Sequence, residues 1–345
     1  MLAATGASAE GVAATPPKPQ RQAPAKPPAP VARPAPASSP ALVAAPTIVA
    51  PVTVRPPATI VVTMSAPLTE WRALDAENTL VLDTDKGRIV IELRPQFAPL
   101  AVARIKRLAR TGVYDGLLFH RVVDGFIAQT GNPNNLDGGK SLEPDLPEEF
   151  TFRLGAETPR AQLARPQGES AGFIGAQPYV SVDEIRMAMS PDRRVSAWGA
   201  FCAGVVGMGH DDDPDGGNSE FFIMRGTTRS LDRQYSVVGR VVMGLEVVRA
   251  LTLGDPPIQP SRMTKARVMA DMPEATRPQI AVLNTLSPEF RDLADEVRRI
   301  KGADFSICDL EAPIQVTATT TASQATPQKG PRAPRAPTAP MPASH

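Results

Sequence analysis

One stretch of the sequence decides the fold: Phe119-His120-Arg121-Val122-Val123-Asp124-Gly125-Phe126-Ile127-Ala128-Gln129-Thr130-Gly131. It places one arginine between apolar runs, and a phenylalanine and a glutamine follow at alternating spacing. An arginine does not lose its charge, so it is rarely left inside an apolar strand without a task. We interpret Arg121 as a cation that polarises an amide beside an apolar slot.

The composition confines the folded part to the middle of the chain. The 345 residues would permit two domains, but the 38 prolines crowd the two ends. Such Pro/Ala-rich segments cannot bury enough apolar surface to offset their ordering entropy. We expect residues 1–69 and 319–345 to be disordered and partly polyproline. This leaves a domain over 70–272 and a C-terminal extension over 273–318, which we expect to pack on that domain.

Charge and hydropathy exclude some classes of function. The chain has 37 basic and 36 acidic residues, a formal net charge of +1. This balance offers no electrostatic case for binding nucleic acid or an acidic membrane surface. No apolar run approaches the ~18–20 residues of a membrane span, so none is expected.

The compartment is suggested by two features, each with an alternative. Ala7-Ser8-Ala9 before Glu10 looks like the end of a signal peptide, although a charged start and an apolar run are missing; plain Ala-rich low complexity is the other interpretation. Cys202 and Cys308 are either two buried thiols or one disulfide tying the extension to the core, which needs an oxidising compartment. We expect a periplasmic or secreted protein, with a cytoplasmic one as the alternative.

The apolar pattern predicts an all-β domain with two helices. A hairpin over 79–93 is followed by a helix over 95–110, which has Pro99 in its first turn. A second helix is expected over 244–251. Many short strands with two helices at separated points predict a closed antiparallel barrel capped by these helices. The further strands are expected at 119–131, 201–208, 220–224, 236–242 and 266–272.

Two segments do not belong to this pattern. Residues 155–198 contain four prolines and one short helical candidate over 182–189, and we treat them as an insertion. A helix over 287–301 has Ser287 as its N-cap candidate. Its apolar stripe is expected to pack onto the barrel rather than to bind a partner, and consists of Phe290, Leu293, Val297 and Ile300.

Three blocks, in order, resemble the cyclophilin family of peptidyl-prolyl cis-trans isomerases. The first is the opening stretch. The others are Gly207-Met208 with Asn218-Ser219-Glu220-Phe221-Phe222-Ile223, and Leu231-Asp232 with Tyr235-Ser236-Val237-Val238-Gly239-Arg240-Val241. The resemblance spans about residues 78–272. It implies an eight-stranded antiparallel barrel with a helix over each end, and it is closest to bacterial periplasmic or secreted members.

The resemblance also implies the reaction. An X-Pro amide rotates over a barrier of roughly 18–20 kcal/mol, so spontaneous isomerisation takes tens of seconds or longer. The enzyme has to favour the twisted amide, and no covalent step is needed. A fixed donor near the prolyl nitrogen can bond a lone pair that exists only in the twisted state.

The family's site residues carry over position by position. Arg121 matches the catalytic guanidinium, and Gln129 matches the residue that braces it. His120 is expected to be structural. The resemblance implies that five residues form the walls of a proline pocket, and ordinary core packing is the alternative for each. These residues are Phe126, Ile127, Phe222, Leu231 and Tyr235.

Two departures bear on activity. Glu220 stands where the family usually has Gln, and a carboxylate so near Arg121 could lock it as an ion pair or align it. Gly209-His210 replaces an Ala-Asn pair that presents backbone to the peptide, and these main-chain contacts could survive the change. Both positions are therefore kept in the predicted substrate site.

We expect an isomerase that acts on proline-containing polypeptides and assists folding. The alternative is a non-catalytic peptide-binding or chaperone module on the same barrel. The insertion is expected either to form a flap beside the groove or to decorate a distant surface. No cofactor or metal is expected, because the calcium-loop-like start at 211–216 has Phe222 where the twelfth-position Glu is needed. The expected oligomeric state is a monomer.

Overall fold

The structure is a computed structural model that describes residues 70–316. The predictions for residues 1–69 and 319–345 lie outside the described residues. Within 70–316 no helix is long and apolar enough to cross a membrane.

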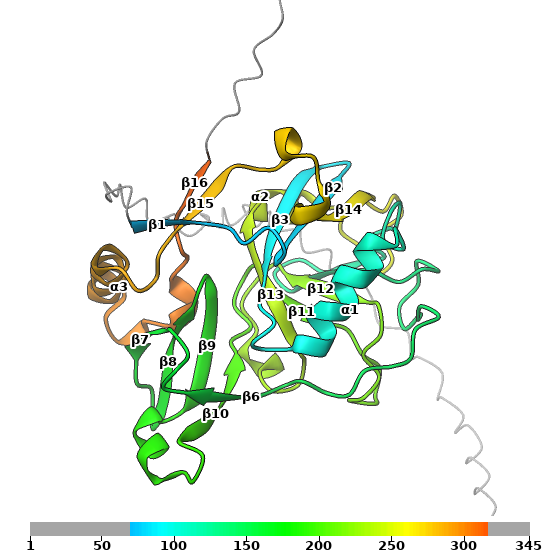
Figure 1. Ribbon diagram of the computed structural model, residues 1–345. Helices are drawn as coiled ribbons and strands as arrows, with labels where there is room; N and C mark the ends of the chain where they lie inside the picture. Colours follow the sequence, from blue (N-terminus) through cyan, green and yellow to red (C-terminus); the bar gives the residue numbers. More distant parts are fainter. Residues whose placement is uncertain (1–69, 317–345) are drawn as a thin grey trace, which may run out of the picture. The chain divides into compact units, whose positions relative to one another are not determined.

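Eight antiparallel strands form one curled sheet in the order β14-β2-β3-β13-β11-β12-β5-β4 (Figure 1). The number and direction of the strands are as expected, whereas the expected closure into a barrel is not shown by their pairing. Its edge strands, β14 and β4, share no continuous ladder. Isolated bridges join Leu118 to Arg262 and Val122 to Gly254 instead. The strands are β2 (Thr79–Thr84), β3 (Gly87–Leu93), β4 (Arg121–Val122), β5 (Ile127–Thr130), β11 (Val205–Met208), β12 (Phe221–Met224), β13 (Val237–Met243) and β14 (Met263–Val268).

Most of these strands lie where the pattern predicted them, with two shifts. β11 begins at Val205 and not at 201, and β14 lies at Met263–Val268 and not at 266–272. The chain turns into 3-10 helices directly after β14. The short 3-10 helices are η3 (Arg229–Leu231), η4 (Met269–Asp271), η5 (Glu274–Thr276), η6 (Gly302–Asp304) and η7 (Ile307–Asp309).

The two expected helices are α1 (Pro99–Arg110) and α2 (Leu245–Ala250). The first starts at Pro99 and not at 95, because proline fits the first helical position. The Glu149 carboxylate accepts from the backbone N–H groups of Leu100 and Ala101 at 3.0 and 2.8 Å. Both helices bury side chains in the core on the inner side of the sheet, among them Ile105 and Val248.

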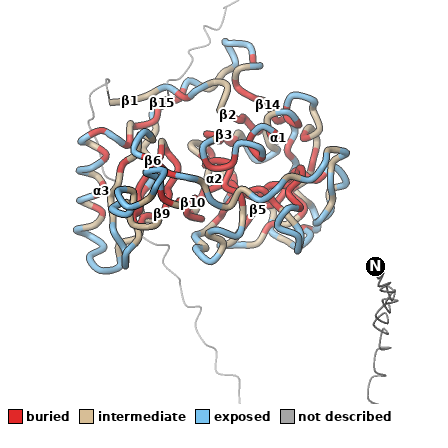
Figure 2. The backbone as a smooth tube through the Cα atoms, turned by 60° about the horizontal axis from the view of Figure 1, so that its bottom comes forward, coloured by how far each residue is buried: buried red, intermediate tan, exposed pale blue. Residues whose placement is uncertain are grey.

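The sheet has apolar residues on both faces. On β3, Ile89 and Ile91 face the inner core, whereas Val90 faces the opposite side, where Met269 and Val282 cover it. Successive strand residues point to opposite faces, so this sheet is covered inside and outside. Buried residues therefore follow its strands closely (Figure 2).

The insertion folds as a sheet of its own, which the sequence did not predict. Five strands pair antiparallel in the order β6-β10-β9-β8-β7. The helical candidate over 182–189 is a 3-10 helix, η2 (Glu184–Met189), capped by the Asp183 side chain. The five strands are β6 (Phe152–Gly155), β7 (Ala161–Ala164), β8 (Glu169–Ile174), β9 (Gln177–Val182) and β10 (Arg194–Gly199).

The C-terminal extension contains a third sheet and a helix. Strand β15 (Ile280–Leu283) pairs with β1 (Trp71–Ala73) on one side and with β16 (Ile314–Val316) on the other. Helix α3 (Pro288–Lys301) begins as predicted, and the Ser287 hydroxyl accepts from the Phe290 N–H at 3.2 Å.

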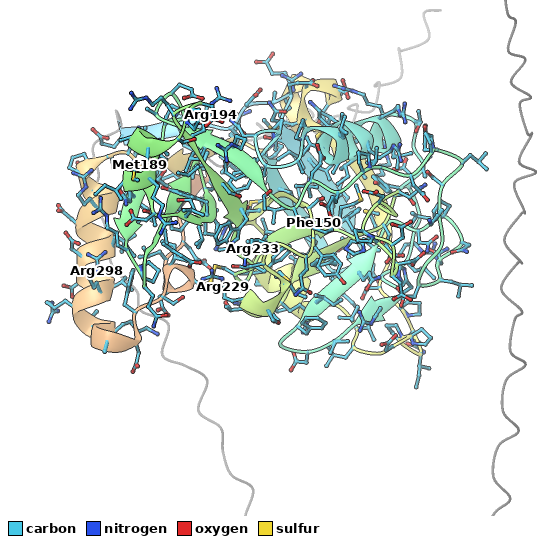
Figure 3. All side chains as sticks on the ribbon, turned by 90° about the horizontal axis from the view of Figure 1, so that it is seen from below. Phe150, Met189, Arg194, Arg229, Arg233 and Arg298 are labelled. Atoms are coloured by element: carbon cyan, nitrogen blue, oxygen red, sulfur yellow. A yellow bond between two sulfur atoms is a disulfide. The ribbon has the colours of Figure 1, made fainter. Side chains whose placement is uncertain are left out.

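The packing partner predicted for α3 was wrong. Helix α3 lies beside β7 and β8 (Figure 1). The Phe290 ring lies 5.3 Å from that of Phe173 on β8, and Arg298, labelled in Figure 3, donates to the Leu163 carbonyl. The helix thus packs on the five-stranded sheet, because the insertion supplies the apolar face it needs. Ile300, expected in the stripe, is 49% exposed.

Cys202 and Cys308 form a disulfide, with their Cα atoms 5.1 Å apart. The bond links η7 of the extension to the segment before β11. Arg240 on β13 adds a second link, because its buried guanidinium lies 3.3 Å from the Glu311 carboxylate. Of the two interpretations for the cysteines, the disulfide is the one observed.

Candidate active site

The opening stretch folds as a tight hairpin and not as one strand. β4 and β5 pair so that Arg121 lies opposite Gln129. The turn between them needs Gly125, whose φ of +64° is a left-handed conformation that favours glycine. The two predicted catalytic residues are therefore cross-strand neighbours, a pairing that brings side chains into contact.

Arg121 is fixed from two sides. Its Nη1 donates to Gln129 Oε1 at 3.2 Å, and its Nε donates to Asp255 Oδ2 at 2.9 Å. Its Cζ lies 6.0 Å from the centre of the Phe126 ring. The other terminal nitrogen, Nη2, has no hydrogen-bond partner among residues 70–316. The Nη2 group of a positioned guanidinium is therefore available for a further hydrogen bond.

Hydrogen bonds connect Glu220 to Arg121 through Gln129. The Gln129 amide nitrogen donates to Asp137 Oδ1 at 2.7 Å and to Glu220 Oε1. Asn132 donates to the other carboxylate oxygen of Glu220 at 3.1 Å. The ion pair of Glu220 with Arg121 that the sequence left open is not formed, and the geometry matches the alternative in which Glu220 aligns the arginine.

Burial changes the protonation of this cluster. It raises the pKa of Glu220 to about 7, and the Asp137 charge adds to the effect, while the hydrogen bonds from Gln129 and Asn132 oppose it. His120 is buried nearby, with Nε2 3.6 Å from Glu220 Oε2, and burial lowers the pKa of this imidazole. The histidine is therefore neutral at pH 7 and lies behind the Gln129–Glu220 contact.

The five predicted pocket residues belong to one apolar cluster on the outer face of the sheet. Ala128 and Ile223 face the inner core, while their neighbours Ile127 and Phe222 face this cluster. The outer cluster is separate from the inner core, but Ile127 and Phe222 are buried in it, so core packing stays the alternative for these residues. Phe126, Leu231 and Tyr235 pack against it while partly exposed.

Aromatic contacts connect the outer cluster with the substituted Gly209-His210 pair. The Tyr235 ring lies 5.2 Å from that of Phe222 and 4.5 Å from that of His210. The Phe150 ring also stacks on His210, with the ring centres 5.4 Å apart (Figure 3). A Cβ at Gly209 would lie 3.2 Å from Glu220 Oε1, so a larger residue here would push on the Glu220 side chain. All ten predicted site residues are thus joined by contacts.

Comparison with known proteins identifies this arrangement. The family model described as "Cyclophilin type peptidyl-prolyl cis-trans isomerase/CLD" matches residues 79–268. The chain belongs to the cyclophilin-type peptidyl-prolyl cis-trans isomerases. It is 33% identical over 215 residues to a probable peptidyl-prolyl cis-trans isomerase of Brucella suis, covering 58% of this chain and 86% of that protein.

A solved structure and a further relative agree with that assignment. The crystal structure of cyclophilin AquaCyp293 from Hirschia baltica is 35% identical, with a TM-score of 0.66, and the match covers 71% of this chain and 93% of that one. Peptidyl-prolyl cis-trans isomerase ppi1 of Schizosaccharomyces pombe is 29% identical over 191 residues, which is 54% of this chain and 95% of that protein. The chain is therefore an isomerase enzyme for proline-containing peptides.

Three residues of this cyclophilin site were missed by the sequence analysis. Asp255 holds Arg121 from 134 positions away, and Asp137 accepts from Gln129 out of an exposed loop. Phe201 stacks on Phe222 at 5.8 Å. Only Phe201 carried a signal, because it begins an apolar run; single aspartates in polar loops carry none.

The insertion of this cyclophilin borders the site. The guanidinium of Arg233 lies 4.8 Å above the Trp198 ring of β10 (Figure 3). Arg233 belongs to the loop that also carries Leu231 and Tyr235. The five-stranded sheet therefore contacts the loop that forms one side of the aromatic cluster, which argues against a distant decoration.

Proposed function

We propose that this enzyme accelerates rotation about X-Pro bonds by donating a hydrogen bond from Arg121 to the prolyl nitrogen. The observation that supports this is the Arg121 guanidinium itself. Gln129 and Asp255 hold its Nη1 and Nε, Nη2 has no hydrogen-bond partner among residues 70–316, and Cζ lies 6.0 Å from the centre of the Phe126 ring. The nitrogen lone pair leaves conjugation as the amide twists, so the bond forms in the transition state and not in the planar ground state. A five-order acceleration requires about 7 kcal/mol of such differential stabilisation.

The apolar cluster is proposed as the proline site. Phe126 lies beside Arg121, and Phe222 and Tyr235 belong to the same apolar cluster. Burial of apolar surface contributes a binding free energy of roughly 25 cal/mol per Å². This contribution would hold the proline ring in the site and leave its amide free to rotate. The amide can then rotate while the ring stays bound.

Gln129 is proposed to orient the arginine, and Glu220 to orient Gln129. The Gln129 amide has its nitrogen on two carboxylates and its oxygen on Arg121. Acceptors on one end therefore fix which end faces the guanidinium. The family comparisons favour this enzyme over the non-catalytic peptide-binding module.

We further propose that the enzyme assists folding in an oxidising compartment, periplasmic or secreted. The Cys202–Cys308 disulfide supports this, since disulfides persist in such compartments and are rare in the cytosol. The intact mass of the protein from its native host, with and without reductant and alkylation, is the measurement. Alkylated thiols without reductant would contradict the proposal.

We also propose that the isolated bridges between the sheet edges close the sheet into a barrel. Reciprocal bonds join Val122 and Gly254 at 2.7 and 2.9 Å, and Phe119 donates to the Ser261 carbonyl at 2.9 Å. Slow amide exchange of Phe119, Val122 and Gly254, comparable to strand residues, would support closure. Exchange as fast as in exposed loops would contradict it.

Substitution of Arg121 tests the catalytic proposal. Arg121→Ala should lower kcat/KM for an X-Pro peptide, measured by a protease-coupled assay, by two orders of magnitude or more, as for loss of an oxyanion-type donor of roughly 10²–10³. Peptide binding should change much less. Arg267→Ala is the matched control, because Arg267 is also a partly exposed strand arginine paired with an aspartate. Unchanged kcat/KM in Arg121→Ala would refute the mechanism.

A further inference from the structure

Three ligand-type side chains meet next to Gln129. Candidate ligand atoms of His120, Asp137 and Glu220 all lie within 4.8 Å of one another. They come from three separate places: the residue before β4, the loop after β5 and the residue before β12. We call this set the His-Asp-Glu cluster.

His120 is the unusual member of the cluster. It is 4% exposed, and neither ring nitrogen has a hydrogen-bond partner among the described residues. Its Nε2 points at Glu220 Oε2 from 3.6 Å, which is too long for a hydrogen bond. A buried imidazole left unpaired costs roughly 1–3 kcal/mol, so a partner between these two atoms would stabilise the site.

The distance between His120 Nε2 and Glu220 Oε2 suits a shared metal ion better than a direct hydrogen bond. A metal with ligands at about 2.0–2.2 Å in tetrahedral geometry holds neighbouring ligand atoms roughly 3.4 Å apart. The observed 3.6 Å between His120 and Glu220 is close to that value. Asp137 is exposed on its loop and can complete a third position by a small side-chain movement.

The donor set selects the class of metal. Calcium takes 6–8 oxygen ligands, and magnesium uses carboxylates with several waters. One imidazole with two carboxylates is a set for zinc(II) or a similar divalent transition metal, with an open fourth position. The cluster therefore fits a borderline transition cation.

We propose that His120, Asp137 and Glu220 bind a divalent transition metal such as zinc(II), and that the bound metal inhibits the isomerase by releasing Gln129. The inhibitory part rests on the function proposed above for Gln129 and Arg121. The metal-binding part is independent of it.

The coupling follows from shared acceptors. The Gln129 amide nitrogen donates to both Asp137, at 2.7 Å, and Glu220. A metal on the same two carboxylates competes with these N–H groups for the oxygen lone pairs. Without its hydrogen bonds to Asp137 and Glu220, the Gln129 amide no longer has a fixed orientation towards Arg121. Because the coupling is reciprocal, conditions that fix Gln129 should weaken metal binding by the same factor.

Metal binding is tested on the full chain after treatment with a chelator. Cobalt(II) is titrated and its visible absorption recorded, and zinc(II) is then added to displace it. We expect one equivalent of cobalt with the intense bands of low-coordinate geometry. Asp137→Asn and Glu220→Gln should each weaken binding at least about tenfold. Asp213→Asn, in the exposed loop at 211–216, is the control and should bind like the unaltered chain.

Asp137→Asn keeps the experiment decisive, because an exposed side chain can be changed without disturbing the core. Absence of cobalt bands, or equal affinity in Asp137→Asn and the unaltered chain, overturns the site. Binding confined to Asp211–Asp215, shown by loss in Asp213→Asn, also overturns it.

Inhibition is measured on the same samples. Zinc(II) should lower kcat/KM about tenfold or more with the midpoint found for binding, and chelator should restore it. Each variant is compared with its own metal-free activity, and the zinc effect should disappear in Asp137→Asn. Stoichiometric binding without inhibition overturns the coupling. Failure of the catalytic proposal is distinguished separately, because it appears as full activity of Arg121→Ala in chelator alone.

Discussion

Replacing Glu220 by Gln should raise the free energy of unfolding above neutral pH. In acid the replacement should bring no such gain. Burial raises the pKa of Glu220 from 4.5 to about 7 in the folded protein. Between these two values the folded state binds more protons than the unfolded state. Stability therefore falls as pH rises through this window, and the cost is complete above pH 7.

The magnitude follows from the size of the shift. A change from 4.5 to about 7 is 2.5 pH units, and each unit is worth about 1.36 kcal/mol. The carboxylate thus costs about 3 kcal/mol at pH 8.5 that it does not cost at pH 4. Glutamine at this position never ionises, so it does not carry this cost in the free energy of unfolding. It still offers an oxygen to Gln129, but Asn132 loses an acceptor, at about 1 kcal/mol independent of pH.

The measurement is urea unfolding of both proteins from pH 4 to pH 8.5, with chelator present. The difference in unfolding free energy between Glu220→Gln and the unaltered chain should grow by about 3 kcal/mol over this range. Glu157→Gln, which removes an exposed carboxylate, should stay within about 0.5 kcal/mol. A difference that does not vary with pH would show that Glu220 ionises normally and that the account of its burial is wrong.

Three further predictions concern the contacts that surround the site. Cys202→Ser should lower the free energy of unfolding by about 4–5 kcal/mol, because the disulfide closes a loop of 106 residues, and an unchanged urea midpoint would contradict this. Phe290→Ala should cost about 3–5 kcal/mol in the same assay, since its fully buried ring packs on Phe173; a loss below about 1 kcal/mol would mean that α3 is not docked. Asp255→Asn should change stability by less than about 1 kcal/mol but reduce kcat/KM, because its exposed ion pair serves to orient Arg121; equal kcat/KM would remove that role.

The eight-stranded sheet and its helices were predictable because their patterns are local. The hairpin of β2 and β3 alternates residues between an inner and an outer face, and α1 buries Ala101, Ile105 and Leu108 at helical spacing. A proline at the first helical position of α1 and of α3, and the Ser287 cap of α3, then set where these helices begin. These signals lie within a few residues of each other and need no knowledge of the tertiary fold.

The five-stranded sheet was missed for a physical reason. Strands β8 and β9 are buried on both faces, so the alternation of apolar and polar residues that marks a half-buried strand is absent. Gly172 and Pro178 also lie inside these strands, and such residues usually interrupt one. Part of this burial comes from α3, more than a hundred residues later, and no local pattern indicates it.

The site was predictable as a set of residues but not as a network. The motif placed Arg121, Gln129 and Glu220 together correctly. It could not show that Gln129 lies between the other two, because that depends on side-chain directions set by the β4–β5 and β5–β12 registers. Asp137 and Asp255 were outside any recognisable motif, although both accept hydrogen bonds from the predicted pair.

The extension and the proline site are connected through one short segment. The disulfide fixes Cys202, and its neighbour Phe201 stacks on Phe222 at 5.8 Å. The Phe201 N–H donates at 2.9 Å to Asp232, which follows Leu231. Because Phe201 packs on Phe222 and lies next to the disulfide, the extension helps to hold the aromatic cluster in place. The proposed proline site is therefore supported in part by residues that lie beyond the matched family region, 79–268.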